Sequence, residues 1–318
     1  MTVARVWTGV LMQIVVVDSS QVVLRVIGSL LEARGHTVHE FTESDEALEF
    51  LSSAPEVRVL ITSLEVRPMN GLELCWAVRL LAEDRRPLHI ITMSSANSVH
   101  NLAEALDSGA DDFIEKPPRA EELHARLRAA ERLTKLQEEL IRLAETDGLT
   151  GLLNRRAFRE RTDSVIAKIA HGRTPSLIVV DIDHFKKIND VHGHDIGDQA
   201  ICAVADLFQE VGIVGRLGGE EFGILLPERD LESAVFHAEG LRVRVRALRV
   251  ACGDGTIGLT CSFGVTTWAA GDTIPAFLKR ADVAVYAAKA AGRNRVMVET
   301  RPDSLALSKT RFGSDQHR

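Results

Sequence analysis

The sequence predicts an α/β protein made of two domains joined by a charged helix. In its N-terminal half, five short apolar segments alternate with stretches of helical character, which is the pattern of a doubly wound parallel sheet. In its C-terminal half, strand-like segments flank a Gly-Gly pair that is followed by acidic residues. A length of 318 residues also favours two domains, because a single domain has about 100 to 200 residues.

The strands expected in the N-terminal domain are short apolar runs. They cover residues 13–17, 37–41, 57–62, 89–93 and 112–114, and the first helix covers about residues 20–34. In a doubly wound sheet the ligand site lies at the carboxyl ends of the strands. Functional residues of this domain are therefore expected just after these runs.

The segment Gly109–Pro117 makes the region of about residues 13–120 resemble a response-regulator receiver domain, which has a flavodoxin-like fold. The resemblance implies a phosphate-accepting aspartate at the end of the third strand, eight residues before Gly71, but that position holds Ser63. A serine hydroxyl is a far weaker nucleophile than a carboxylate at neutral pH. Aspartyl phosphorylation at this position is therefore excluded.

Other receiver positions are only partly kept. The acidic pair that holds Mg²⁺ after the first strand is reduced to Asp18 followed by Ser19, so this site should bind the ion poorly. The switch hydroxyl at Ser94 and the lysine at Lys116 remain. We expect a degenerate receiver that serves dimerisation or the docking of an unknown protein partner.

A charged helix is expected over residues 119–146, as an extension of the last receiver helix. One apolar set has the 3-4-3 spacing of a coiled-coil seam, and comprises Leu133, Leu136, Leu140 and Leu143. A second set, offset from the first, comprises Leu123, Leu127 and Ala130. One interpretation is a single amphipathic helix packed on its own domain. The other, which we favour, is a short parallel dimer stalk.

The C-terminal half contains a Gly-Gly pair between two expected strands, residues 213–217 and 222–226. We expect a two-residue turn in which the glycines supply positive φ. The acids that follow, Glu220 and Glu221, should point to opposite sides because side chains alternate along a strand. A hairpin tip of this composition suits a metal ion and phosphate.

A second acidic segment follows the apolar strand at residues 177–180. It begins at Asp181 and runs into a helical stretch that contains Lys186. Carboxylates at the end of a buried strand, followed by a lysine, are suited to hold a hard cation together with a triphosphate.

Five separated motifs make the region of about residues 145–300 resemble the GGDEF family of diguanylate cyclases. They are Asp147–Arg156, Asp181–Asp190, Gly193–Asp198, Arg216–Phe222 and Ala281–Arg295. The resemblance implies an α+β fold with a central, mostly antiparallel sheet, related to the palm of nucleotide cyclases and polymerases. It also implies that a homodimer condenses two GTP molecules into cyclic di-GMP and releases two pyrophosphates.

The resemblance further implies roles for single residues. The expected catalytic residues are Asp181, Glu220 and Glu221. The expected ligands of Mg²⁺, for which Mn²⁺ is an alternative, are Asp181, the backbone carbonyl of Ile182, and Glu220. Guanine is expected to contact Asn189 and Asp198, and the triphosphate to contact Lys186, Lys289 and Arg293. Asp183 is expected to be a structural acid.

Many members of this family bind their product at an inhibitory RxxD site. At the corresponding place the sequence has Gln209-Glu210-Val211-Gly212. Without the guanidinium fork, which clamps phosphate or a guanine edge, the product should bind poorly there.

Composition limits the partners. A net charge of −7 with a pI near 5.9 argues against nucleic acid, and no apolar run approaches the length of a membrane span. Four cysteines without a CxxC pair suit a reducing cytoplasm. We expect a disordered leader, a receiver, a helical linker, a catalytic domain and a disordered tail at residues 1–12, 13–118, 119–146, 147–300 and 301–318.

Two function classes remain. The first is an active cytoplasmic diguanylate cyclase. The second is a catalytically inactive signalling module that only binds a nucleotide or a protein. Retention of the expected metal, guanine and phosphate residues favours the first.

Overall fold

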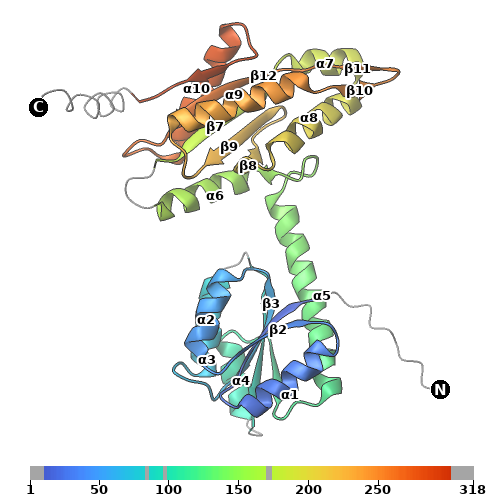
Figure 1. The fold of residues 1–318 in the computed structure, drawn as a ribbon, viewed down its shortest axis with the longest axis vertical. Coiled ribbons are helices and arrows are strands. Elements are labelled where there is room, and N and C mark those ends of the chain that lie inside the picture. Colours follow the sequence, from blue (N-terminus) through green and yellow to red (C-terminus); the bar gives the residue numbers. More distant parts are fainter. Residues whose placement is uncertain (1–10, 83–85, 96–98, 170–173, 302–318) are drawn as a thin grey trace, which may run out of the picture. The chain divides into compact units, whose positions relative to one another are not determined.

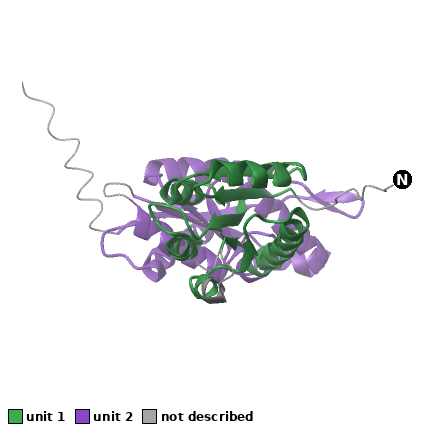
Figure 2. Ribbon diagram, turned by 90° about the horizontal axis from the view of Figure 1, so that it is seen from below, with its two compact units in different colours: residues 1–142 green, residues 143–318 purple. Residues whose placement is uncertain are grey.

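The computed structural model describes residues 11–82, 86–95, 99–169 and 174–301 (Figure 1). The chain divides into two compact units, residues 1–142 and 143–318, which Figure 2 shows in different colours. Most of the predicted leader and tail lies outside the described residues. Met12, which the prediction placed in the leader, is buried, and its N–H donates to Nδ1 of His36 at 3.3 Å.

The first unit has the predicted doubly wound sheet. Its strands pair in the order β2-β1-β3-β4-β5, and every pairing is parallel. They are β1 Gln13–Val17, β2 Thr37–Phe41, β3 Val57–Ser63, β4 His89–Ser94 and β5 Asp112–Glu115. The helices are α1 Gln21–Glu32, α2 Ser44–Ser53, α3 Gly71–Ala82, α4 Val99–Asp107 and α5 Ala120–Glu145.

Alternation along the buried strands produces a separate core on each face of this sheet. Val15 and Val17 belong to a cluster with residues of α2 and α3, whereas Ile14 and Val16 pack with residues of α1 and α5. The central strand β1 is therefore a nearly continuous apolar run, because both of its faces are covered.

Helix α5 is continuous over 26 residues, and its two apolar sets have different environments. Leu123, Leu127 and Ala130 are buried in the core shared with α1. The set with coiled-coil spacing is instead exposed, with 48%, 61%, 65% and 62% of the surface accessible at Leu133, Leu136, Leu140 and Leu143. The first set thus packs on its own domain, and the second is left available to a partner.

The second unit is built on a mostly antiparallel sheet in the order β13-β12-β7-β9-β8-β6. Only the edge pairs β12–β13 and β6–β8 are parallel. The strands are β6 Leu153–Asn154, β7 Ser176–Ile182, β8 Ile213–Arg216, β9 Glu221–Leu226, β12 Cys261–Thr267 and β13 Val296–Val298. A separate hairpin consists of β10 Val250–Cys252 and β11 Gly255–Ile257.

Helices cover both faces of this sheet (Figure 1). Helices α8 (His194–Phe208) and α9 (Leu231–Ala247) share one core with β7, and α6 (Arg155–Lys168) and α10 (Ile274–Ala290) share the other. Strand β7 is buried along its whole length. It leads into the short helix α7 (Phe185–His192), so the predicted acidic segment begins where this central strand ends.

Gly264 on β12 allows α10 to lie close to the sheet. A Cβ atom at this residue would lie 2.2 Å from the carbonyl oxygen of Ala281, which is backbone and cannot turn away. We expect Gly264→Ala to lower the free energy of unfolding by roughly 2 kcal/mol or more, because the helix must shift. Urea unfolding would measure this. Gly148→Ala is the control, since no heavy atom lies within 4 Å of the added Cβ; equal costs for the two changes would refute the close-approach argument.

Candidate active site at the end of strand β7

The end of β7 brings several of the predicted site residues together. Asp181 is buried and lies directly opposite Glu221 of β9. Residues paired across antiparallel strands point to the same face, so these two carboxylates are neighbours. The N–H of Ile182 donates to the carbonyl oxygen of Glu220 at 3.3 Å, which places Glu220 at the same edge.

Lys289 reaches this edge from the last turn of α10. Its Nζ lies 2.6 Å from Oδ2 of Asp181. Burial raises the pKa of Asp181, Lys289 opposes that rise, and the charges of Glu221 and Asp183 add to it. The site therefore concentrates more negative charge than Lys289 alone offsets.

This donor set fits a divalent cation. A positive charge nearby stabilises the charged form of a buried carboxylate such as Asp181, and hard oxygen ligands suit Mg²⁺. Among the described residues, no group of three or more His, Cys, Asp or Glu side chains forms a complete metal site.

Asp183 has a different environment from Asp181. Its carboxylate accepts hydrogen bonds from the hydroxyls of Thr260 at 2.7 Å and Ser262 at 2.6 Å, and from the N–H of Asn294 at 3.0 Å. Three donors satisfy most of its acceptor capacity. These bonds join the end of β7 to β12 and to the turn after α10, as expected for a structural acid.

The Gly-Gly tip differs from the two-residue turn that was predicted. Leu217 N–H donates to the carbonyl of Glu221 at 2.8 Å, so three residues, Gly218 to Glu220, lie between these positions. Neither glycine has positive φ. A Cβ atom at Gly219 would meet nothing within 4 Å, and one at Gly218 would approach only the Glu221 side chain. The glycines thus keep the tip free of side chains rather than supply a special backbone conformation.

Arg216 stabilises this tip and connects it to the end of the linker. Its guanidinium donates to the carbonyls of Gly218 and Gly219, with Nη2 2.7 Å from the latter. Nη1 of the same side chain pairs with both carboxylate oxygens of Asp147 at 3.0 and 3.2 Å. The sequence placed both residues in motifs, but motif spacing alone gave no sign that they meet.

Helices α7 and α8 form a corner that positions Asn189. Its Oδ1 is buried and has no hydrogen-bond partner. A Cβ atom at Gly197 would lie 1.9 Å from this oxygen, so glycine leaves the space that Asn189 occupies. Asp198 is the next residue and is exposed. The predicted guanine residues therefore lie on the two helices that meet at this corner.

The remaining predicted phosphate residues flank the same segments. Lys186 is exposed in the first turn of α7. Arg293 follows α10 in the left-handed conformation, with φ of 62°. Their contact with a triphosphate stays a prediction.

Comparison with known proteins agrees with this architecture. A family model described as "Diguanylate cyclase, GGDEF domain" matches residues 144–295, and one described as "Response regulator receiver domain" matches residues 14–128. The crystal structure of the coiled coil and GGDEF domain of DgcB from Caulobacter crescentus, in complex with c-di-GMP, is 36% identical. The match covers 55% of this chain and 98% of that one, with a TM-score of 0.51.

The chain belongs to the GGDEF family. Among curated relatives, the response regulator PleD of Caulobacter vibrioides is 36% identical over 271 residues, which are 80% of this chain and 59% of PleD. Diguanylate cyclase DgcM of Escherichia coli is 39% identical over 168 residues, 51% of this chain and 40% of DgcM. The chain thus spans only about half the length of these relatives.

The receiver of this GGDEF protein brings its remnant site residues together. Lys116 Nζ donates to Oγ of Ser63 at 2.6 Å and also forms an ion pair with Asp18. Ser19 donates to the carbonyl of Glu65 at 3.1 Å, and Ser94 is buried. Lys116 therefore contacts both Ser63 and Asp18, two of the residues predicted for the receiver site.

The segment in place of an RxxD motif lies between α8 and β8. A Cβ atom at Gly212 would lie 2.5 Å from the carbonyl oxygen of Leu225, so only glycine fits without a backbone shift. The aspartate position of the motif is thus closed by packing as well as by sequence. In the described part of this GGDEF protein, no helix is long and apolar enough to cross a membrane.

The Arg216–Asp147 ion pair makes the stability of the GGDEF unit depend on pH. Burial acts to raise the pKa of Asp147, but hydrogen bonds from Arg216 and Thr150 outweigh it, and the pKa lies below its usual value. A depressed carboxyl pKa stabilises the fold above about pH 4, and this stabilisation is lost as the pH falls through the folded pKa.

Asp147→Asn should therefore lower the free energy of unfolding by on the order of 1 kcal/mol at neutral pH, and by progressively less as the pH falls below about 4 and through the folded pKa. Urea unfolding at neutral pH and at a series of lower pH values measures the difference. Asp163→Asn, at an exposed residue of α6, is the control. A cost that persists at low pH would show that the ion pair is not its source.

Proposed function

We propose that this chain is a diguanylate cyclase that condenses two GTP molecules into cyclic di-GMP and two pyrophosphates. The observation that carries the proposal is the buried, unpartnered Oδ1 of Asn189, in the helix that follows the carboxylate edge at Asp181. A buried acceptor without a donor costs about 1–3 kcal/mol. Guanine supplies donors at N1–H and N2–H₂, which Asn189 and Asp198 can share. The names of the relatives support the same activity.

In this proposal Asp181, Glu220 and the carbonyl of Ile182 would hold Mg²⁺, which when bound would supply positive charge to offset the phosphates. The two facing sites would then bring the 3′-hydroxyl of one GTP to the α-phosphorus of the other, with pyrophosphate as the leaving group. Glu221 lies beside Asp181, since the β7–β9 register pairs the two residues. Lys289 turns from Asp181 to the phosphates, where Lys186 and Arg293 also bind. The residues of the chain thus position two substrates and balance their charge.

The reaction requires two GTP-loaded domains to face each other, so we propose a homodimer. Support comes from the exposed leucine set of α5, which has the spacing of a coiled-coil seam. A stalk shared by two chains raises the effective concentration of one catalytic domain for the other.

We further propose that the receiver acts without phosphorylation, through dimerisation or by docking a protein partner. The ion pair of Lys116 with Asp18 and its hydrogen bond to Ser63 support this, because the positive charge already has partners in the unmodified protein. Product feedback through the RxxD position is not expected, because Gly212 leaves no room for an aspartate there.

Replacing a proposed metal ligand should abolish catalysis but leave the fold intact. We expect Asp181→Ala and Glu220→Ala to reduce cyclic di-GMP formation by roughly a hundredfold or more. Chromatography of the products measures this, and Glu210→Ala, at an exposed residue in the turn after α8, is the control. Near-normal turnover in either variant would overturn the metal assignment. Wild-type protein that binds GTP but forms no product would instead be an inactive signalling module.

Disrupting the exposed leucine set should dissociate the dimer. We expect Leu136→Glu with Leu140→Glu to shift the protein to monomers in sedimentation velocity, and to lower turnover most at low protein concentration. Lys135→Gln lies on the same helix outside this set and should change neither property. A double variant that remains dimeric would exclude the stalk as the interface.

Beryllofluoride with Mg²⁺, which mimics a phosphoaspartate, should change neither turnover nor oligomeric state. The reason is that Ser63 offers no carboxylate and Ser19 replaces one of the acids that hold the ion. A receiver with all its acidic residues, treated in parallel, shows that the reagent is active. A rise in cyclase activity of this protein on treatment would contradict the proposal.

A further inference from the structure

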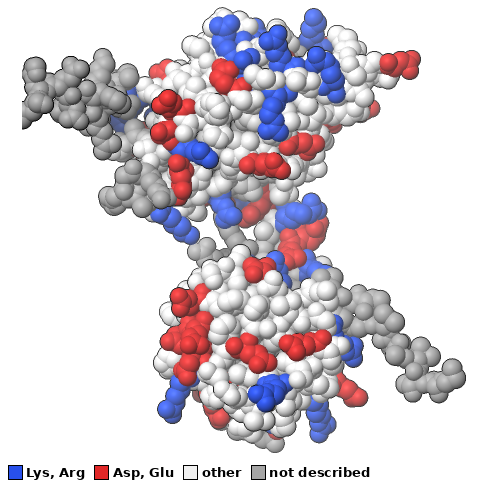
Figure 3. All heavy atoms as spheres, in the orientation of Figure 1, with Lys and Arg blue, Asp and Glu red and all other residues white. Residues whose placement is uncertain are grey.

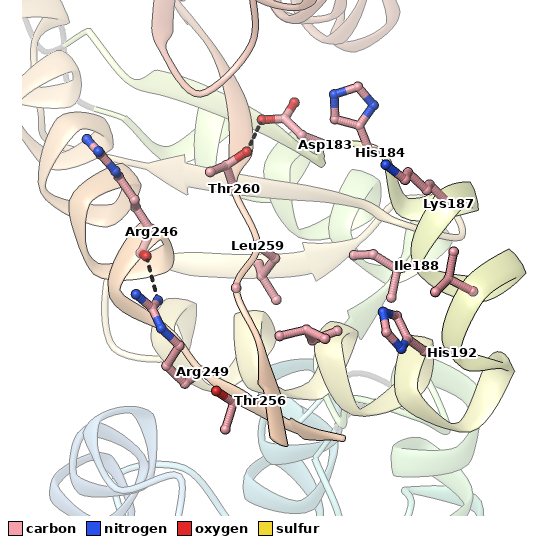
Figure 4. A pocket seen from close by; sticks show the side chains of 13 residues that line it. Asp183, His184, Lys187, Ile188, His192, Arg246, Arg249, Thr256, Leu259 and Thr260 are labelled. Carbon is pink, nitrogen blue, oxygen red and sulfur yellow. Dashed lines mark hydrogen bonds between the residues drawn. The ribbon is translucent and has the colours of Figure 1, made fainter. Parts of the chain in front are cut away.

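A cavity lies on the opposite side of α7 from the residues proposed to bind GTP. It has a volume of about 700 Å³ and is bounded by α7, the β10–β11 hairpin and the segment that leads from α9 into that hairpin (Figure 4). The lining residues that matter here are Lys187, Val191, His192, Arg249, Ile257 and Leu259. None of them has a role in the proposed cyclase site.

The geometry of α7 separates the two sites. Residues that are three or four positions apart share a face of a helix. Lys187, Ile188, Val191 and His192 therefore form one face, which lines the cavity, whereas Lys186 and Asn189 lie on the other. At the end of this helix, Nδ1 of His192 lies 3.3 Å from Sγ of Cys252, which connects α7 to β10.

The cavity has an excess of positive charge. Lys187 and Arg246 form no ion pair within the described part of the chain, and Arg249 donates only to the backbone carbonyls of Arg246 and Leu248, at 3.1 and 2.7 Å. The one acid in the lining is Asp183, whose oxygens already accept three hydrogen bonds. Figure 3 shows basic side chains gathered around the end of α9 that leads to β10.

The same cavity has an apolar wall. Leu259 is buried and Ile257 is half-buried, while Val191 is 62% exposed at the edge of the cavity. A phosphate alone would pair with the cations but leave Val191 in water. A ligand that bears both a phosphate and a flat apolar body would use both parts of the lining, because stacking or burial of the body removes apolar surface from water.

We propose that this cavity is a second ligand site, which binds a nucleotide through Lys187 and Arg249 and places the base against Val191 and Ile257. Because α7 carries Asn189 on its other face, occupancy should also change the affinity for GTP. That consequence rests on the proposed cyclase function, whereas binding itself does not.

Titration calorimetry of the full chain with ATP, CTP, UTP and GTP, in EDTA to suppress Mg²⁺-dependent loading of the substrate site, tests the proposal. We expect at least one nucleotide to bind with one site per chain. Lys187→Gln and Arg249→Gln should each weaken this binding by about tenfold, roughly the effect of one charged hydrogen bond. Arg244→Gln, at an exposed position of α9 outside the lining, should not, and nor should Asp198→Ala at the substrate site.

Two further measurements distinguish the contribution of the phosphates to binding from that of the base. Val191→Ser should weaken nucleotide binding but not the binding of tripolyphosphate. Tripolyphosphate that binds as tightly as every nucleotide would refute the contribution of the apolar wall. Absence of saturable nucleotide binding, or binding that Lys187→Gln and Arg249→Gln leave unchanged, would overturn the site. If binding occurs but the protein forms no cyclic di-GMP, only the proposed cyclase function fails.

Discussion

The edge of the second unit at the end of β7 depends on the hydrogen bonds that the buried carboxylate of Asp183 accepts. This carboxylate accepts from two hydroxyls on and beside β12 and from a backbone N–H in the turn after α10. That turn carries Arg293 and directly follows the helix end that carries Lys289. Loss of this carboxylate would leave the buried hydroxyl of Ser262 and two half-buried donors without their acceptor, and would release the turn from β7. The positions of two cations at the site therefore depend on an acid that touches neither.

Three aspartates of this unit illustrate how environment gives one side chain different roles. Asp183 is held by neutral donors and acts as a fixed connection. Asp181 is buried beside other acids, and among the described residues its cation partner is Lys289. Asp147 is bound by the planar fork of Arg216, whose two nitrogens link the end of the linker to the hairpin tip. Only the second of these arrangements leaves charge available for a metal ion.

The architecture of the first unit could be predicted from hydrophobic pattern, because its central strands are mostly apolar and alternate with helical stretches. The sheet of the second unit was expected from the family resemblance. The two apolar sets of α5 differ in their offset along the helix, and this offset separates the buried set from the exposed one. The prediction of a two-residue turn at Gly218 and Gly219 was wrong. Glycine is compatible with many turn lengths, and the turn length depends on how β8 pairs with β9, which the local sequence does not determine. The resemblance singled out Asp181, Glu220 and Lys289, and the structure places them at one edge of the sheet, while their roles stay predictions. The sequence could not predict that Oδ1 of Asn189 lacks a hydrogen-bond partner, or that a cavity lies beside α7. Both depend on packing between segments that are far apart in the sequence.

The close approach of Gly212 to the carbonyl of Leu225 also bears on how this protein can evolve. An RxxD motif here needs an arginine at residue 209 and an aspartate at residue 212. The arginine is sterically simple at the exposed Gln209, but the aspartate requires β9 to move. An aspartate acquired without that movement would make the fold less stable. Packing at one glycine therefore sets a structural barrier to this motif that a comparison of the two residues alone does not reveal.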